Sequence, residues 1–187
     1  MSIYNVYESS PDSILGSQTK DLVQSKKWLI HCLEQLGLDS FDHIYCLGSW
    51  YGLLGSLLVD SDLQFSHLYM IDWDKEKSDY VAQKSVSNKR VHSICMDVNR
   101  IRYVGESICV INTSTNDIEG RNWFTSIPSG SLVVLQGKDH QDLSNGEETL
   151  ERFDKVYPLS QTLYLGSLVV EGVDSIIYNR FMKIGTK

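Results

Sequence analysis

Five short apolar runs, each ending at a small or polar residue, constrain the fold of this chain more than any other feature. The runs cover residues 43–47, 67–71, 91–96, 107–111 and 131–136. Apolar runs of this length are typical of strands that are buried on both faces of a parallel sheet. The segments between them are long enough for crossover connections, which place helices on both faces. The sequence therefore predicts a Rossmann-like α/β fold.

The remaining segments complete this architecture. Apolar residues spaced three and four apart predict a helix over 19–36 that ends near Gly37, and further helices are expected over 53–59 and 75–85. Residues 162–170 and 176–184 are two β-rich runs joined by a short polar turn, which predicts an antiparallel hairpin. The expected sheet is mostly parallel and seven-stranded, with a C-terminal antiparallel hairpin and helices on both faces.

Length and composition limit the domain organisation and the partners. A chain of 187 residues builds one sizeable core, so a single domain over 1–187 is expected, with the N-terminal helical region 1–40 as a candidate lid over the substrate. The formal charge of −7 makes nucleic acid a poor first choice of partner. Neither a signal peptide nor a bilayer-spanning apolar stretch is recognisable, which predicts a cytoplasmic protein without a membrane span.

The four cysteines are scattered and form neither a CxxC motif nor a Cys/His cluster with zinc spacing. We expect Cys32, Cys46, Cys95 and Cys109 to be buried free thiols in a reducing compartment. No metal site is expected.

Polar residues gather directly after the apolar runs, where the carboxyl ends of parallel strands form a ligand-binding edge. They are a glycine-bracketed turn at 48–52, an acidic segment at 72–74, Asp97, and a polar segment at 112–117. A carboxylate that ends the second strand, 24 residues after Gly48, is placed to accept hydrogen bonds from both ribose hydroxyls. Asp72 is the first candidate for this role and Asp74 is the alternative. An adenosine-containing ligand is implied.

The glycine turn indicates which adenosine ligand fits. A GxGxxG dinucleotide motif needs glycine where this chain has Trp50, and a GxxxxGK[ST] phosphate-binding loop is absent. S-adenosylmethionine (SAM) carries no phosphate, so a bulky residue in the turn is tolerable.

Residues 43–136, with these motifs, resemble the class I SAM-dependent methyltransferases. The resemblance implies that residues 48–52 hold the methionine moiety, that Asp72 holds the ribose and that Asp97 reads the adenine amine. The C-terminal hairpin is similar to the reversed seventh strand of that family. The turn departs from the family's acid-x-Gly-x-Gly form, because Cys46 stands where the acid is expected. Gly-Ser-Trp-Tyr-Gly, Asn-Thr-Ser and Tyr-x-Arg-Phe-Met together resemble small methyltransferase-like proteins of bacteria and their phages.

Two groups of candidate site residues follow. The cofactor-binding candidates are Gly48, Ser49, Trp50, Tyr51, Gly52, Asp72, Trp73, Asp97, Val98 and Asn112. The catalytic candidates are Asn112, Ser114, Asp117 and His140.

Structural alternatives remain open for several of these residues. Residues 112–117 resemble only loosely the Asn/Asp-Pro-Pro-Tyr loop of amino methyltransferases, since both begin with a polar residue directly after an apolar strand. Residues 113–117 could instead cap the following helix. His140 is either a general base or an exposed loop histidine. The aromatic residues of the site either stack on a ligand or pack, and Arg180 either pairs with an acidic substrate or forms a surface salt bridge.

The expected activity is SAM-dependent methyl transfer to an unidentified acceptor, with an amino group as one hypothesis. The alternatives are a non-catalytic module that binds SAM or S-adenosylhomocysteine (SAH), a SAM-cleaving enzyme, and another nucleotide-dependent Rossmann enzyme. The sequence predicts neither the acceptor nor the oligomeric state.

Overall fold

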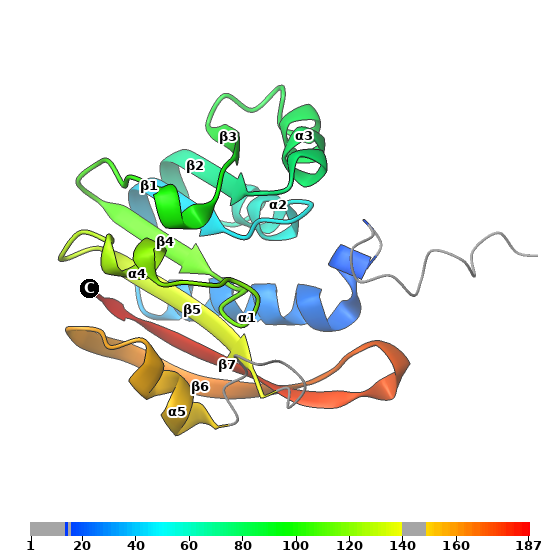
Figure 1. Cartoon of the computed structure of the whole chain (residues 1–187), viewed down its shortest axis with the longest axis vertical. Coiled ribbons are helices and arrows are strands. Elements are labelled where there is room, and N and C mark those ends of the chain that lie inside the picture. The colour runs from blue at the N-terminus through cyan, green and yellow to red at the C-terminus, as the bar shows by residue number, and fades with distance from the viewer. Residues whose placement is uncertain (1–13, 15, 140–148) are drawn as a thin grey trace, which may run out of the picture.

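A computed structural model gives the structure of the chain and describes residues 14, 16–139 and 149–187 (Figure 1). Its centre is a seven-stranded sheet in the order β3-β2-β1-β4-β5-β7-β6. The strands are β1 (Ser40–Leu47), β2 (Gln64–Asp72), β3 (Val91–Cys95), β4 (Ile108–Asn112), β5 (Leu132–Lys138), β6 (Gln161–Glu171) and β7 (Ile177–Thr186). The expected Rossmann-like topology is confirmed.

Helices cover both faces of the sheet, so the central strands are buried on both sides. The α-helices are α1 (Lys20–Gln35), α2 (Leu53–Val59), α3 (Lys75–Lys84), α4 (Asn122–Thr125) and α5 (Leu150–Val156). The 3-10 helices are η2 (Gly16–Gln18), η3 (Val98–Arg100) and η4 (Val173–Ser175). One core cluster joins α1, α2 and α3 to the sheet, and a second cluster joins η3, α4 and α5 to the opposite face.

The strand directions decide which residues meet at the carboxyl edge of the parallel strands. Strands β1 to β5 pair in parallel, so their carboxyl ends lie along one edge of the sheet. Strand β7 runs antiparallel to β5, with Lys138 opposite Arg180. The beginning of β7 therefore lies at the same edge of the sheet as the end of β5.

The observed elements differ from the expected ones in few places. The sequence-based prediction missed α4 and α5, which have only four and seven residues. Cys32, Cys46 and Cys109 are buried free thiols as expected, but Cys95 is exposed because it ends the edge strand β3. The expectation that all four thiols are buried is therefore wrong for Cys95.

Two absences concern only the described part of the chain. In residues 14, 16–139 and 149–187, no helix has both the length and the apolar character needed to span a bilayer. The same residues contain no group of three or more His, Cys, Asp or Glu side chains arranged to hold a metal ion.

Candidate functional site

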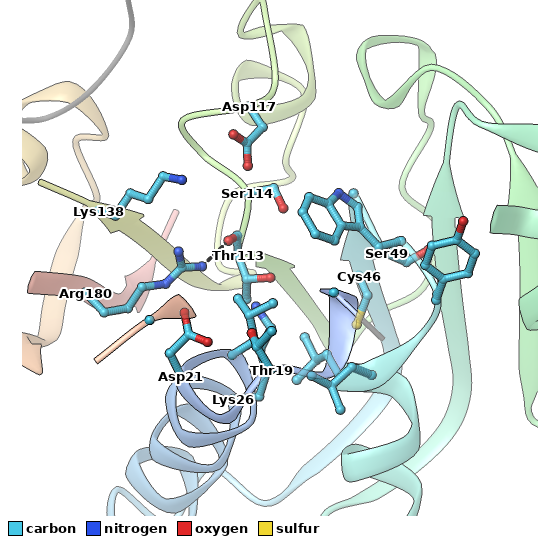
Figure 2. Close-up of a pocket in the computed structure, with 18 of the residues that line it drawn as sticks. Thr19, Asp21, Lys26, Cys46, Ser49, Thr113, Ser114, Asp117, Lys138 and Arg180 are labelled. Atoms are coloured by element: carbon cyan, nitrogen blue, oxygen red, sulfur yellow. Dashed lines mark hydrogen bonds between the residues drawn. The ribbon is translucent and has the colours of Figure 1, made fainter. Parts of the chain in front are cut away.

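A cavity of about 450 Å³ opens at the carboxyl ends of β1 and β4, between the start of α1 and the start of β7 (Figure 2). The turn after β1 lines one side of this cavity. The segment after β4, the end of β5 and the C-terminal hairpin line the other side. Six predicted site residues are among the lining residues: Gly48, Ser49, Trp50, Tyr51, Ser114 and Asp117.

The turn at 48–52 is a compact structure that only particular residues permit. Gly48 has φ +64°, and a Cβ at this position would lie 3.2 Å from the Cβ of Ser114. Glycine thus allows both the left-handed conformation and the close approach of the segment after β4. Trp50 has φ +48°, which is uncommon for a bulky residue, and Gly52 starts α2 with φ +81°. The N–H of Ser49 donates to the carbonyl of Ile71, which ties the turn to β2.

Asp72 fixes the turn from the neighbouring strand. Its side chain is buried, with 3% of the residue exposed, and Oδ2 accepts a 2.9 Å hydrogen bond from the N–H of Trp50. Oδ1 accepts a 3.0 Å hydrogen bond from the N–H of Asp74. The carboxylate therefore holds the turn after β1 and the backbone after β2 in one arrangement.

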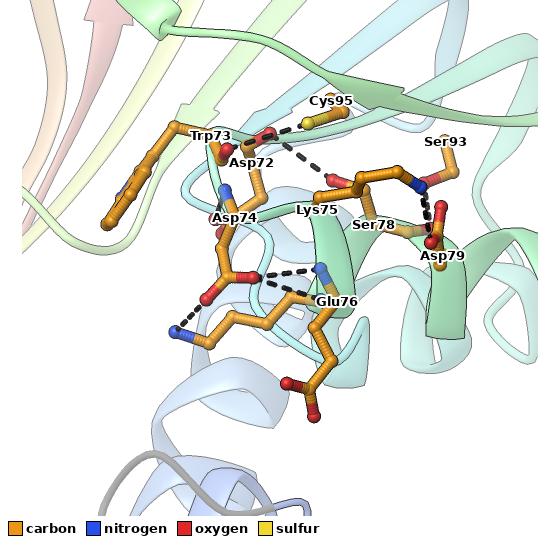
Figure 3. A network of polar contacts seen from close by, with 10 residues as sticks. Asp72, Trp73, Asp74, Lys75, Glu76, Ser78, Asp79, Ser93 and Cys95 are labelled. Atoms are coloured by element: carbon orange, nitrogen blue, oxygen red, sulfur yellow. Dashed lines mark hydrogen bonds and ion pairs between the residues drawn. The ribbon is translucent and has the colours of Figure 1, made fainter.

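Asp74 has a different task (Figure 3). Its Oδ1 accepts hydrogen bonds from the N–H groups of Glu76 and Lys77, which makes Asp74 the N-cap of α3. Its other oxygen lies 3.3 Å from the Lys77 ammonium. The local structure thus accounts for Asp74 as a helix cap, whereas Asp72 is the last residue of β2, at the carboxyl edge of the sheet.

A second, open hollow lies at the ends of β2 and β3. Trp73, Cys95, Met96, Asp97 and Arg100 line it, and 78% of Trp73 is exposed. Asp97 also accepts a 2.9 Å hydrogen bond from the N–H of Asn99 at the start of η3. Val98, by contrast, is buried in the core cluster beneath η3, so its side chain faces away from this hollow.

Asn112 turns inward, away from the cavity. It is fully buried, its Oδ1 accepts a 2.8 Å hydrogen bond from the N–H of Ser114, and its Nδ2 has no partner among the described residues. The following residues are held against β5, because Thr115 Oγ1 donates to the carbonyl of Gln136 and Asn116 Oδ1 accepts from the N–H of Lys138.

Two further predictions about this region have different outcomes. The alternative that residues 113–117 cap the next helix is wrong, because α4 begins only at Asn122 and follows Arg121. His140 lies outside the described residues.

Sequence reasoning missed several charged and polar residues of the cavity wall. They are Asp21, Lys26, Lys138 and Tyr178. Lys26 lies on the same helix stripe as Leu22, Leu29 and Leu33, where a charged residue among buried ones was a recognisable signal. Burial and the charge of Arg180 lower the pKa of Lys26 well below its usual value. The Tyr178 hydroxyl donates a 2.5 Å hydrogen bond to Asp21 Oδ2, which joins α1 to β7.

Arg180 is buried, which differs from the surface position considered for it. It is 6% exposed and lines the cavity, and its guanidinium donates to the backbone carbonyl of Thr113. The surface salt bridge considered for Arg180 is therefore wrong. Burial lowers the pKa of Arg180 from its usual value.

The comparisons with known proteins show the fold. No family model matches the chain, and no curated protein sequence matches it. Several solved structures, however, have a similar fold. N-methyltransferase NodS from Bradyrhizobium japonicum WM9, in complex with SAH, is 11% identical with a TM-score of 0.70, covering 97% of this chain and 94% of that one.

Two other solved structures are similar. A proposed RNA methyltransferase from Pyrococcus horikoshii is 14% identical with a TM-score of 0.67, covering 91% of this chain and 85% of that one. Magnesium protoporphyrin IX methyltransferase from Synechocystis PCC 6803, with bound SAM, is 9% identical with a TM-score of 0.62, covering 87% of this chain and 78% of that one. The chain has the class I methyltransferase fold.

Proposed function

We propose that this protein binds SAM across the cavity and the open hollow and transfers its methyl group to an acceptor seated in the cavity. The position of Asp72 carries this proposal. Its strand, β2, lies between β1, which ends at the cavity, and β3, which ends at the open hollow. A buried carboxylate between two hollows is where the ribose of an elongated nucleoside ligand belongs.

The chemistry of the residues fits such a ligand. Each oxygen of Asp72 accepts one backbone N–H and retains a second lone pair for a ribose hydroxyl. Trp73 offers an exposed ring beside Asp97 for the adenine, and the turn at 48–52 offers backbone to the methionine moiety. Asp74 is the weaker ribose candidate because the cap of α3 and Lys77 already engage its carboxylate.

SAM supplies a methyl group that is already activated by the sulfonium, so the protein mainly has to align the acceptor and exclude water. Ser114 and Asp117 line the cavity and could hold a hydroxyl or amino group of the acceptor. Asn112 contributes differently, because its inward side chain shapes the turn that presents Ser114. An amino acceptor suits the carboxylate of Asp117, which accepts hydrogen bonds.

Calorimetric titration of the purified protein with SAM, SAH and NADH tests the cofactor. We expect SAM and SAH to bind with micromolar affinity and NADH to give no heat. Tight NADH binding without SAM binding would overturn the proposal.

Incubation with methyl-labelled SAM and a cell extract tests the reaction. We expect the label to enter an acceptor. SAM binding without labelled product would favour a non-catalytic module, and SAM consumption without an acceptor would indicate cleavage.

A further inference from the structure

We propose that the β7 side of the cavity is an anion subsite, in which Arg180 together with Lys138 binds a carboxylate or phosphate group of the methyl acceptor. This inference rests on the proposed function, since it assigns a chemical class to the acceptor. Figure 2 shows Arg180 and Lys138 beside Thr113, on the opposite side of the view from Ser49.

Arg180 provides the main evidence. The residue is nine-tenths buried, and one of its terminal N–H groups donates to the Thr113 carbonyl. Its Nε is buried and has no hydrogen-bond partner among the described residues. A buried donor without a partner is rare and costly, and a guanidinium presents its donors in a fork that matches carboxylate and phosphate oxygens. Arg180 itself lines the cavity, so an acceptor oxygen seated there can reach the guanidinium.

Lys138 places a second cation beside the guanidinium. Lys26 also reaches the cavity from α1, with 8% of the residue exposed, but burial and the charge of Arg180 lower its pKa well below the usual value, so the subsite rests on Arg180 and Lys138. Lys138 is opposite Arg180 in the β5–β7 register, and no ion pair engages its ammonium within the described ranges. An anion bound between these residues would offset their mutual repulsion.

The cavity wall also carries two acids, Asp21 and Asp117. Neither lies within ion-pair distance of Arg180 in the described structure, so the guanidinium has no ionic partner there. Asp21 Oδ2 already accepts from Tyr178, and Oδ1 is buried without a described partner. The acceptor that fits therefore carries an anionic group for Arg180 and Lys138, and Asp21 stays engaged with Tyr178.

A direct measurement uses the side-chain Nε–Hε signals of the six arginines in ¹⁵N NMR spectra of the full chain. The signal that is missing in Arg180→Lys identifies Arg180. Protein saturated with SAH is titrated with sodium acetate and with inorganic phosphate, and sodium chloride at matched ionic strength is the control. We expect the Arg180 signal to move saturably with acetate, phosphate or both, and not with chloride.

Lys138→Met tests the subsite without removing the buried guanidinium. We expect it to weaken binding of the responding anion at least about threefold, because it removes a half-buried cation from the cavity wall. The matched control is Lys155→Met, which changes an exposed lysine of α5 that does not line the cavity and should leave binding unchanged. Thermal unfolding of each variant checks that the fold is retained.

The outcomes are distinct. A response to acetate alone assigns a carboxylate, a response to phosphate alone assigns a phosphate, and both support the subsite. An Arg180 signal that ignores both anions, or follows chloride equally, overturns it. The proposal is also overturned if the anions shift the Arg180 signal only in the absence of SAH and Lys138→Met binds SAH more weakly. The cations would then bind the carboxylate of the cofactor. Failure of the wild-type protein to bind SAH would refute the proposed function, whereas the anion titration without SAH would still report on the subsite.

Discussion

Substitution of Gly48 by alanine tests whether the turn after β1 is part of the ligand site. Gly48 has φ +64°, and a Cβ there would meet the Cβ of Ser114 at 3.2 Å and Oγ at 3.4 Å. Gly37, at the end of α1, has nearly the same backbone conformation, with φ +67°, but an added Cβ has nothing within 4 Å. The pair therefore separates the cost of the backbone conformation from the effect of crowding in the site.

The expected losses of stability and of SAM affinity follow from the backbone conformation and from the crowding by the added Cβ. A residue with a Cβ in the left-handed region costs about 1–2 kcal/mol, so both alanine variants should lose about that much free energy of unfolding. For a chain of this size the corresponding decrease in Tm is about 2–8 °C. Gly48→Ala must in addition move the turn or Ser114 by a few tenths of an ångström. We expect it to weaken SAM binding at least about tenfold, while Gly37→Ala binds SAM like the wild type.

Urea unfolding gives the two stabilities, and calorimetric titration with SAM gives the two affinities. Equal SAM affinity in both variants, at equal loss of stability, would refute the reasoning, because the turn would then tolerate the displacement. A large loss of stability in Gly48→Ala alone would mean that the contact with Ser114 is mainly structural.

Three further predictions concern single groups. Asp72→Ala should lower SAM affinity at least about a hundredfold and decrease the free energy of unfolding by about 1–3 kcal/mol, because two backbone N–H groups lose their acceptor. Calorimetry measures the affinity and urea unfolding measures the stability. Unchanged SAM affinity would contradict the ribose assignment. Cys95 should react with a thiol reagent in the folded protein much faster than the three buried cysteines, as mass spectrometry of the labelled peptides would show, and equal labelling rates would argue against the exposed position. Burial and the neighbouring His67 lower the pKa of His92, so the folded state takes up fewer protons than the unfolded state below pH about 6.5. The free energy of unfolding should then fall as the pH is lowered through this range, and urea unfolding of His92→Gln should show a shallower fall; the same slope in both proteins would contradict the shift.

The sequence predicted most of the sheet because the central strands are buried on both faces. A strand such as β4, in which all five residues are buried, produces a continuous apolar run that is easily recognised. The short helices α4 and α5 were missed for the opposite reason, since four and seven residues give too few turns for a periodic pattern. Their presence depends on tertiary packing of Trp123 and Phe153, which are fully buried.

The two sides of the cavity differ in how far the sequence could predict them. The turn at 48–52 and the acid that ends β2 could be placed because they lie at the carboxyl ends of parallel strands, which share one edge. Arg180 could not be placed in this way, because its position depends on the antiparallel register that sets it opposite Lys138. The inward orientation of Asn112 was equally hidden, since a polar residue after a strand can face the ligand or hold its own backbone.

The contacts of Asp72 connect the structure of the turn to its proposed role. A tryptophan with positive φ is costly, and at position 50 the hydrogen bond from its N–H to Asp72 helps to hold it. Lys77 Nζ lies 5.7 Å from the ring centroid of Trp50, so α3 also restrains the side chain. Because the same carboxylate is proposed to receive the ribose, a bound nucleoside would reinforce the turn conformation that the fold already imposes. The fold alone thus organises the turn, which would lower the ordering cost of the proposed binding.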